Sequence, residues 1–212
     1  MKSYGKLTAA LLAAWFLFAL TAGALGLFSN ASARIAAGVG LAAGIPLVLF
    51  FLWIAFSPNF RQFTLSLNPR ILTYAQTWRL LGVVFVILEA RGALPAIFAL
   101  SAGYGDIFIG ATAAFAAFTL ATPNHRAAFV TWQFLGILDL VSAVTLGITA
   151  PIINPSAASM LPMTILPLSL IPTFLVPLFL ILHAISIAQA TAWPSPSAST
   201  PARTSNQTRQ PA

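Results

Sequence analysis

The sequence predicts an all-α protein, a polytopic transmembrane helical bundle of about six spans, and three observations support this fold class. Of the 212 residues, 59% are hydrophobic and only 6% are charged, whereas a soluble domain carries about 25% charged residues. The mean hydropathy is +0.92. The apolar residues are gathered in runs that approach or reach the length of roughly 17–25 residues needed to cross a bilayer as a helix.

Six apolar runs are candidates for spans within a transmembrane domain that covers residues 1–191. The fourth run is the shortest, and we expect the preceding segment, Pro95–Gly105, to be irregular or re-entrant. From residue 192 to 212 proline and polar residues replace the apolar ones, which predicts a disordered cytoplasmic tail. The expected spans are 7–28, 35–56, 74–94, 106–121, 128–150 and 167–190.

The distribution of Lys and Arg predicts the orientation. With the N-terminus inside, the cytoplasmic segments hold seven basic residues and the opposite side holds two, which follows the positive-inside rule. We therefore expect a protein of the inner (plasma) membrane with both ends in the cytoplasm. An alternative is a signal peptide cleaved near Ala31-Ser32-Ala33, which would leave five spans. The apolar run continues to Phe28, and this length favours an intact first span.

Composition and motifs argue against several classes of function. The chain has no cysteine, and its net charge of +7 comes from scattered residues without the cluster that nucleic acid requires. His125 and His183 fall at different depths, which does not suit a haem, and no zinc-ligand spacing or nucleophile motif occurs. We expect no metal, no cofactor, no nucleic-acid partner and no enzymatic activity.

All three acidic residues, Glu89, Asp106 and Asp139, lie inside or at the edge of an expected span. A carboxylate at the bilayer centre costs about 2.5–3.5 kcal/mol on insertion scales, so such groups normally face other helices or water. Arg79, which we expect close enough to the cytoplasmic end of its span to snorkel, and His183 complete the ionisable set. Any activity is expected to involve these five residues.

The segment Gly103-Tyr104-Gly105-Asp106 has two interpretations. Its glycines permit a turn, and Asp106 is a suitable N-cap for the fourth helix. Alternatively, a re-entrant Pro95–Gly105 would leave Asp106 in an aqueous pocket beside Glu89 and Arg91.

Small residues mark the faces that we expect to pack. In the fourth span they oppose Phe108, Phe115 and Phe118, which should face lipid. The pair Gly40 and Gly44 matches GxxxG, which indicates tight packing either within the chain or across a dimer. The glycines expected at helix contacts are Gly40, Gly44, Gly105, Gly110 and Gly136.

Proline recurs every five residues from position 162 to position 177. We expect the first two prolines to precede the sixth span, and Pro172 and Pro177 to kink it. A proline inside a helix frees the carbonyl four residues earlier, here those of Leu168 and Thr173. Either neighbouring groups satisfy these carbonyls, or the carbonyls coordinate an ion or substrate.

Two segments, GALPAIFALSAGYGDIFIG at 92–110 and WQFLGILDLV at 132–141, resemble a group of uncharacterised bacterial multi-pass membrane proteins. The resemblance covers the third to fifth spans, less than half of the chain. It implies a membrane bundle, brings no established activity, and places emphasis on Gly105, Asp106, Gly110 and Asp139.

Two main hypotheses of function follow. The first is a non-enzymatic membrane module (a subunit, assembly factor or sensor) whose polar groups pair inside the bundle. The second is a small permease, proton-linked, that uses Asp106, Asp139 and Glu89. An intramembrane enzyme is a minor alternative. The expected partners are the lipid bilayer and either a second copy or another membrane protein.

Overall fold

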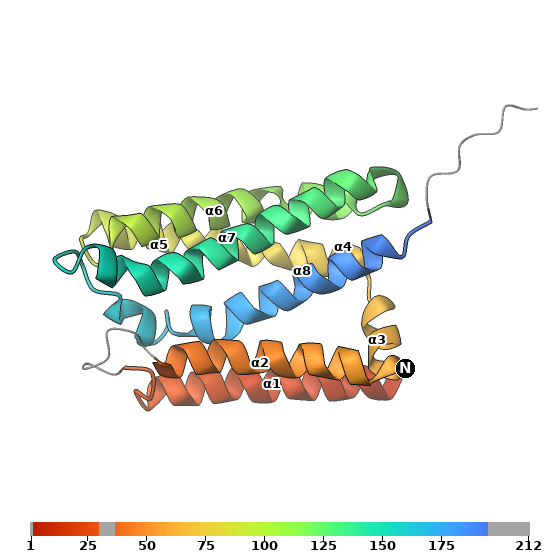
Figure 1. The fold of residues 1–212 in the computed structure, drawn as a ribbon, viewed down its shortest axis with the longest axis horizontal. Helices are drawn as coiled ribbons and strands as arrows, with labels where there is room; N and C mark the ends of the chain where they lie inside the picture. The colour runs from red at the N-terminus through yellow and green to blue at the C-terminus, as the bar shows by residue number, and fades with distance from the viewer. Residues whose placement is uncertain (1, 30–36, 195–212) are drawn as a thin grey trace, which may run out of the picture.

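The computed structural model describes residues 2–29 and 37–194. The Ala31-Ser32-Ala33 segment and most of the expected tail, from 195 onward, lie outside the described residues. Within the described ranges six helices are long and apolar enough to cross a membrane, and no strand occurs. They run side by side along the long axis of the molecule, and α1 begins and α8 ends at the same end of the bundle (Figure 1). The all-α, multi-pass prediction is confirmed.

The first two spans are uninterrupted helices, α1 (Lys2–Ala24) and α2 (Ala37–Phe56). The short helix α3 (Pro58–Leu65) follows and lies across the end of the bundle rather than along it (Figure 1). Its start is well defined, because the Ser57 side chain accepts a hydrogen bond from the Phe60 amide and Pro58 occupies the first turn.

The third span runs from Pro69 to Ala90 and changes its winding midway. It comprises α4 (Pro69–Tyr74), a 3₁₀ stretch η1 (Ala75–Gly82) and α5 (Val83–Ala90). Asn68 caps its start by accepting from the Arg70 amide. The span therefore begins five residues before the expected 74–94. A long 3₁₀ stretch inside a span is uncommon and often marks a functional or strained region.

The fourth span is α6 (Ala96–Phe115), extended by a π-helical turn η2 (Ala116–Leu120). An irregular segment does precede it, but this segment is Arg91–Pro95, where Gly92 has φ +68°. The prediction that Pro95–Gly105 is irregular or re-entrant was wrong, and so was the N-cap role of Asp106, which lies mid-helix. The sequence is ambiguous here because glycine suits both a turn and a close helix contact.

The fifth span consists of η3 (Pro123–His125) and α7 (Arg126–Ile153). The sixth follows a 3₁₀ turn, η4 (Leu161–Thr164), and consists of a π-helical turn, η5 (Ile171–Leu175), and α8 (Val176–Thr191). As expected, the first two prolines of the repeat precede this span and the last two lie within it.

The carbonyls near the prolines of the sixth span find partners within the protein. The Thr173 carbonyl accepts a hydrogen bond from the Trp15 indole N–H of α1 at 3.2 Å. The Leu168 carbonyl accepts from the Ile171 amide at 3.0 Å. Of the two alternatives for these carbonyls, satisfaction by neighbouring groups is the one the structure shows, and α1 is thereby attached to η5.

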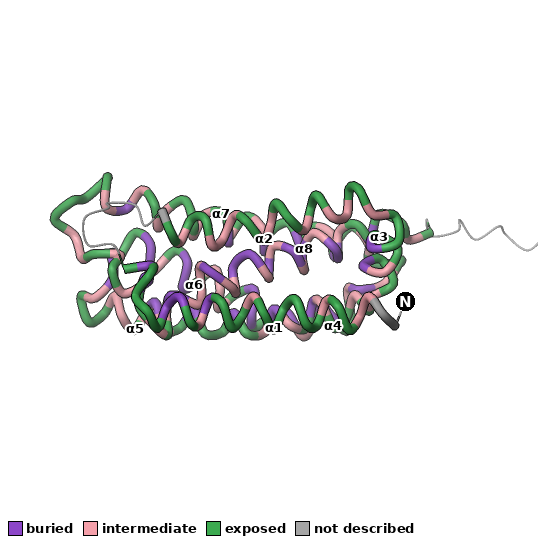
Figure 2. The backbone as a smooth tube through the Cα atoms, turned by 90° about the horizontal axis from the view of Figure 1, so that it is seen from below, coloured by how far each residue is buried: buried purple, intermediate pink, exposed green. Residues whose placement is uncertain are grey.

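The clusters of buried hydrophobic residues lie in the third to sixth spans and the segment that precedes the sixth. Helices α1 and α2 lie on one side of this bundle (Figures 1 and 2). Phe108, Phe115 and Phe118 are all exposed, as expected for lipid-facing residues. No residue in the most apolar stretch of α2 is buried, and a Cβ placed on Gly40 or Gly44 would have no neighbour within 4 Å. The GxxxG pair thus makes no tight contact within the described chain.

Candidate functional site

Arg79 lies at the centre of the bundle and is only 2% exposed. It follows Pro69 by ten residues, which places it roughly 15 Å along the third span, near the middle of a 30 Å hydrocarbon core. The expectation that Arg79 snorkels to the cytoplasmic surface was wrong. The span begins earlier than expected, and the guanidinium has partners at its own depth.

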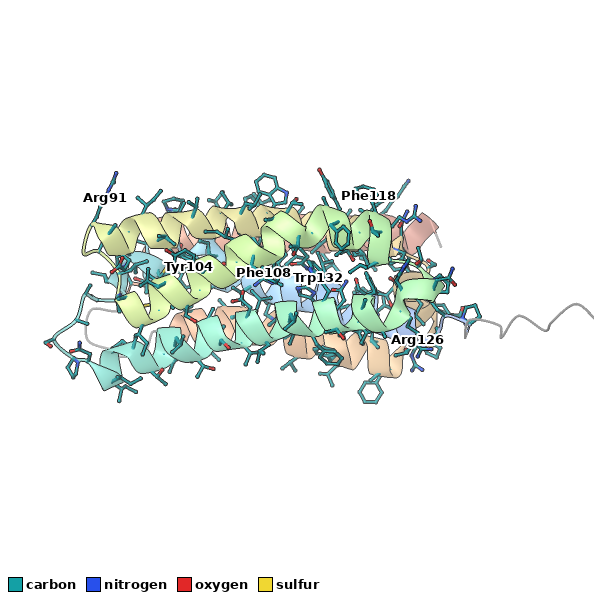
Figure 3. All side chains as sticks on the ribbon, turned by 90° about the horizontal axis from the view of Figure 1, so that it is seen from above. Arg91, Tyr104, Phe108, Phe118, Arg126 and Trp132 are labelled. Carbon is teal, nitrogen blue, oxygen red and sulfur yellow. The ribbon has the colours of Figure 1, made fainter. Side chains whose placement is uncertain are left out.

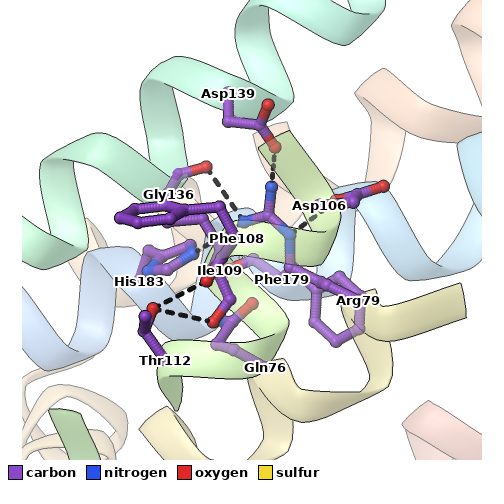
Figure 4. A network of polar contacts seen from close by, with 10 residues as sticks. All are labelled: Gln76, Arg79, Asp106, Phe108, Ile109, Thr112, Gly136, Asp139, Phe179 and His183. Atoms are coloured by element: carbon purple, nitrogen blue, oxygen red, sulfur yellow. Dashed lines mark hydrogen bonds and ion pairs between the residues drawn. The ribbon is translucent and has the colours of Figure 1, made fainter. Parts of the chain in front are cut away.

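The guanidinium of Arg79 joins three other spans (Figure 4). Its Nε donates to Asp106 Oδ1 of α6 at 2.7 Å, and its Nη2 donates to Asp139 Oδ2 of α7. Nη1 donates to the Gly136 carbonyl at 3.1 Å and lies 3.4 Å from His183 Nε2 of α8. We call Arg79, Asp106, Asp139 and His183 the central cluster. One side chain thus holds the third, fourth, fifth and sixth spans in contact.

His183 is completely buried, and its hydrogen bonds indicate its tautomer. Gln133 donates its side-chain N–H to Thr73 Oγ1 at 3.0 Å, which leaves its carbonyl oxygen, Oε1, facing His183 Nδ1. Nδ1 therefore carries a hydrogen and donates it. Nε2 is then the acceptor that the Arg79 N–H requires, because arginine has only donors. The arrangement holds a neutral imidazole beside the guanidinium.

Glycines allow the polar side chains to reach one another. A Cβ on Gly105 would collide with the Asp139 carboxylate, and one on Gly136 would collide with the His183 ring. A Cβ on Gly82 would collide with Asp106 in the same way. Gly110 packs against the backbone of the third span, where its Cβ would lie 2.6 Å from the Leu80 nitrogen. These glycines provide close approach rather than backbone freedom.

The central cluster has an excess of negative charge when both carboxylates are ionised. Two carboxylates, one guanidinium and one neutral imidazole together carry a net charge of −1. The Arg79 side chain is 1% exposed, but those of Asp106 and Asp139 are 14% and 15% exposed. Asp106 also lines a cavity of about 20 Å³, which is room for one water molecule. The arrangement can therefore hold the spans together and exchange a proton.

Glu89 and Arg91 do not belong to this cluster. Glu89 lies near the end of α5, and its carboxylate makes no hydrogen bond or ion pair with the residues the structure describes. Arg91 is exposed at one end of the bundle, opposite the end where Arg126 lies (Figure 3). The hypothesis that Asp106 shares a pocket with these two residues was wrong, because Asp106 faces Arg79 instead.

Sequence reasoning missed the uncharged polar residues that support the cluster. Gln133 and Thr73 orient His183, and the Trp132 indole donates to Thr112 Oγ1 at 2.9 Å. Gln76 is buried and donates to the Phe179 carbonyl at 3.4 Å. A signal was present, because an amide inside an apolar span is expensive unless it is hydrogen-bonded. Gln133 also precedes Gly136 by three residues, which places both on one face of α7.

No group of three or more His, Cys, Asp or Glu side chains positioned to hold a metal ion occurs among the described residues.

No curated protein and no solved structure shows a significant match to the chain. One family model does match, and it spans residues 36–191, from α2 to the end of α8. The match includes every residue of the central cluster and excludes α1. Because it covers well over half of the chain, the protein belongs to the family described as "Domain of unknown function (DUF8737)".

Proposed function

We propose that this protein is a non-enzymatic module of the inner (plasma) membrane, with both ends in the cytoplasm. In this proposal the central cluster fixes the third to sixth spans in a single arrangement and so presents a defined surface to a membrane partner. The protein is thereby a subunit, assembly factor or sensor.

The observation that carries the proposal is the position of Arg79. Its guanidinium is buried, and its hydrogen bonds reach a carboxylate of α6, a carboxylate of α7 and a backbone carbonyl of α7. In lipid, a charged group without partners at this depth raises the free energy of the protein. The bundle is therefore most stable when Arg79 meets all its partners at once. A rotation of any one of these helices would leave a charge unpaired.

The space around the cluster also favours a structural role over passage of a solute. The cavity beside Asp106 measures about 20 Å³, whereas sites for small organic molecules measure about 300–1,000 Å³. An organic substrate would not fit there in this conformation.

The test combines flux with stability. The full chain is reconstituted in liposomes that contain a pH-sensitive dye, and a pH gradient is applied across the membrane. We expect no proton flux above that of protein-free liposomes, and we expect Arg79→Met to lower the thermal unfolding midpoint in detergent. The proposal of a non-enzymatic module would be refuted if the wild type showed proton flux and Asp139→Asn abolished it without changing the thermal unfolding midpoint.

The second candidate function is a proton-linked permease, and the charge of the central cluster favours it. Two partly exposed carboxylates share one guanidinium, so the cluster can bind one proton and become neutral. The stretch η1 contains Arg79, and Ile171 and Leu175 of η5 line the small cavity beside Asp106. Such departures from α-helical winding are often found at functional sites. The liposome experiment above decides between the two candidates.

The face of α2 that carries Gly40 and Gly44 is where we place a homodimer contact. The two glycines are one helical turn apart, and no part of the described chain covers them. A second copy of α2 would bring two small-residue faces together, which allows the close backbone approach that stabilises membrane helix pairs.

A further inference from the structure

We infer that the groove between α2, α3 and α8 is a binding site for one anionic phospholipid, with an acyl chain in the groove and the phosphate at Arg61. The inference concerns a surface remote from the central cluster and does not depend on the proposed function.

The groove is large and apolar. It has a volume of about 400 Å³, and its walls come from Phe50, Phe51 and Ile54 of α2, from α3, and from α8, whose contribution is mostly small residues. Ala184 and Ala188 of α8 and Ala192, which follows its last residue, recur every four residues, so they lie on one side and leave the space open. Figure 1 shows α2 and α8 diverging toward the end where α3 crosses.

The dimensions of the groove suit an acyl chain. It extends from Ala192, directly after α8, back to Ala184, which is eight residues or roughly 12 Å. One leaflet contributes about 15 Å of hydrocarbon, half of the usual 30 Å core. The groove therefore begins near the headgroup level and follows most of one leaflet. Ala188 and Thr191 are exposed, so the groove is open to the surrounding bilayer.

Arg61 of α3 lies at the outer end of the groove and is exposed. Its Nε donates to the Ile54 carbonyl and its Nη2 to the Ala55 carbonyl, both at 3.3 Å, which holds the guanidinium over the end of α2. Two of its five N–H bonds are used in this way, and the others make no hydrogen bond to the described protein.

The chain offers Arg61 no side-chain carboxylate. It contains three acidic residues in all. Asp106 and Asp139 pair with Arg79, and Glu89 lies in the last turns of α5, toward the opposite end of the bundle. The described residues therefore leave the counter-charge of Arg61 to be supplied by another group. A phospholipid with net negative charge provides it at the correct depth, together with an apolar chain for the groove.

Lipid retention measured by native mass spectrometry tests the inference. The full chain is reconstituted in vesicles of phosphatidylcholine and phosphatidylglycerol at a 9:1 ratio and then extracted in mild detergent. The mass of the protein with its bound lipids is measured. We expect one retained phosphatidylglycerol per chain, in preference to the more abundant phosphatidylcholine. Arg61→Gln should lower this retention about fivefold, the effect of roughly one basic residue on an anionic surface, and Arg61→Lys should preserve most of it.

Two further variants separate the groove from general lipid contact. Ala188→Phe places a large side chain in the groove and should abolish retention of phosphatidylglycerol. Arg70→Gln removes an exposed arginine that does not line the groove and should leave retention unchanged. Equal retention of the two lipids, no effect of Arg61→Gln or Ala188→Phe, or a doubled mass without lipid would each overturn the inference. Gel filtration confirms that each variant is folded.

Discussion

The imidazole of His183 occupies the space that a side chain on Gly136 would need. A Cβ at position 136 would collide with the Cε1 and Nε2 atoms of the ring. If the ring turned aside, it would lose the hydrogen bond of its Nδ1 to Gln133 and the contact of its Nε2 with Arg79. The fifth and sixth spans can therefore approach this closely only with glycine at position 136.

Gly136→Ala should destabilise the protein. Overpacking of a filled site costs about 1–3 kcal/mol, which exceeds the 0.5–1 kcal/mol that alanine gains over glycine within a helix. The measurement is the thermal unfolding midpoint of the detergent-solubilised chain. Gly147→Ala is the matched control on the same helix, because its Cβ would meet only ordinary contacts, the nearest at 3.5 Å. Equal midpoints for the two variants would contradict the close packing at position 136.

The number of spans could be predicted from the sequence, and the start of the fourth could not. Apolar run length follows directly from bilayer thickness, so six spans emerge from hydropathy alone. Gly103 and Gly105 suggested a turn, but in the structure each faces a neighbouring helix at close range. The sequence alone does not show whether a given glycine forms a turn or allows a close helix contact. The true break, at Gly92 and Pro95, lies a few residues earlier.

The members of the central cluster could be predicted, and their pairing could not. Arg79, Asp106, Asp139 and His183 are all expensive in lipid, which identified them without a structure. Which of them meet depends on the rotation and depth of each helix. The third span starts five residues earlier than expected, which moves Arg79 from within snorkelling distance of the helix end to the middle of the span. Glu89, equally expensive by its chemistry, remained outside the cluster.

Arg79→Met should be among the most destabilising single substitutions in the chain. It removes the buried cation that two partly exposed carboxylates share, and breaking a fully buried pair costs about 3–5 kcal/mol. The measurement is again thermal unfolding, where each kcal/mol corresponds to a midpoint shift of about 2–4 °C for a chain of this size. Arg70→Met, at an exposed arginine near the start of the same span, is the control and should change stability by less than about 0.5 kcal/mol.

The two aspartates should be partly interchangeable. Asp106→Asn or Asp139→Asn alone reduces the cluster charge from −1 to 0 and leaves one carboxylate on Arg79. Each single variant should therefore unfold at a higher temperature than Arg79→Met. The double variant leaves a buried guanidinium without a carboxylate and should lose about 3–5 kcal/mol. Additive effects of the two substitutions would show that Arg79 does not couple them.

The uncovered face of α2 leads to a cross-linking prediction that the absence of native cysteine makes simple to test. Gly40→Cys in native membranes should form a disulfide-linked dimer when an oxidant is added, because two copies of this face are expected to meet. Ala42→Cys, on the opposite side of the helix, is the control and should remain monomeric. A monomer for Gly40→Cys, or equal dimer formation by both variants, would exclude this contact.

The expected orientation can be tested with two exposed serines at opposite ends of the bundle. Ser66 follows α3, at the end where α1 begins, and Ser156 follows α7 at the other end. The positive-inside rule places Ser66 in the cytoplasm, beside Arg61 and Arg70. In intact cells a membrane-impermeant thiol reagent should label Ser156→Cys but label Ser66→Cys only after the membrane is permeabilised. The reverse pattern would invert the topology, and with it the leaflet from which Arg61 could bind lipid.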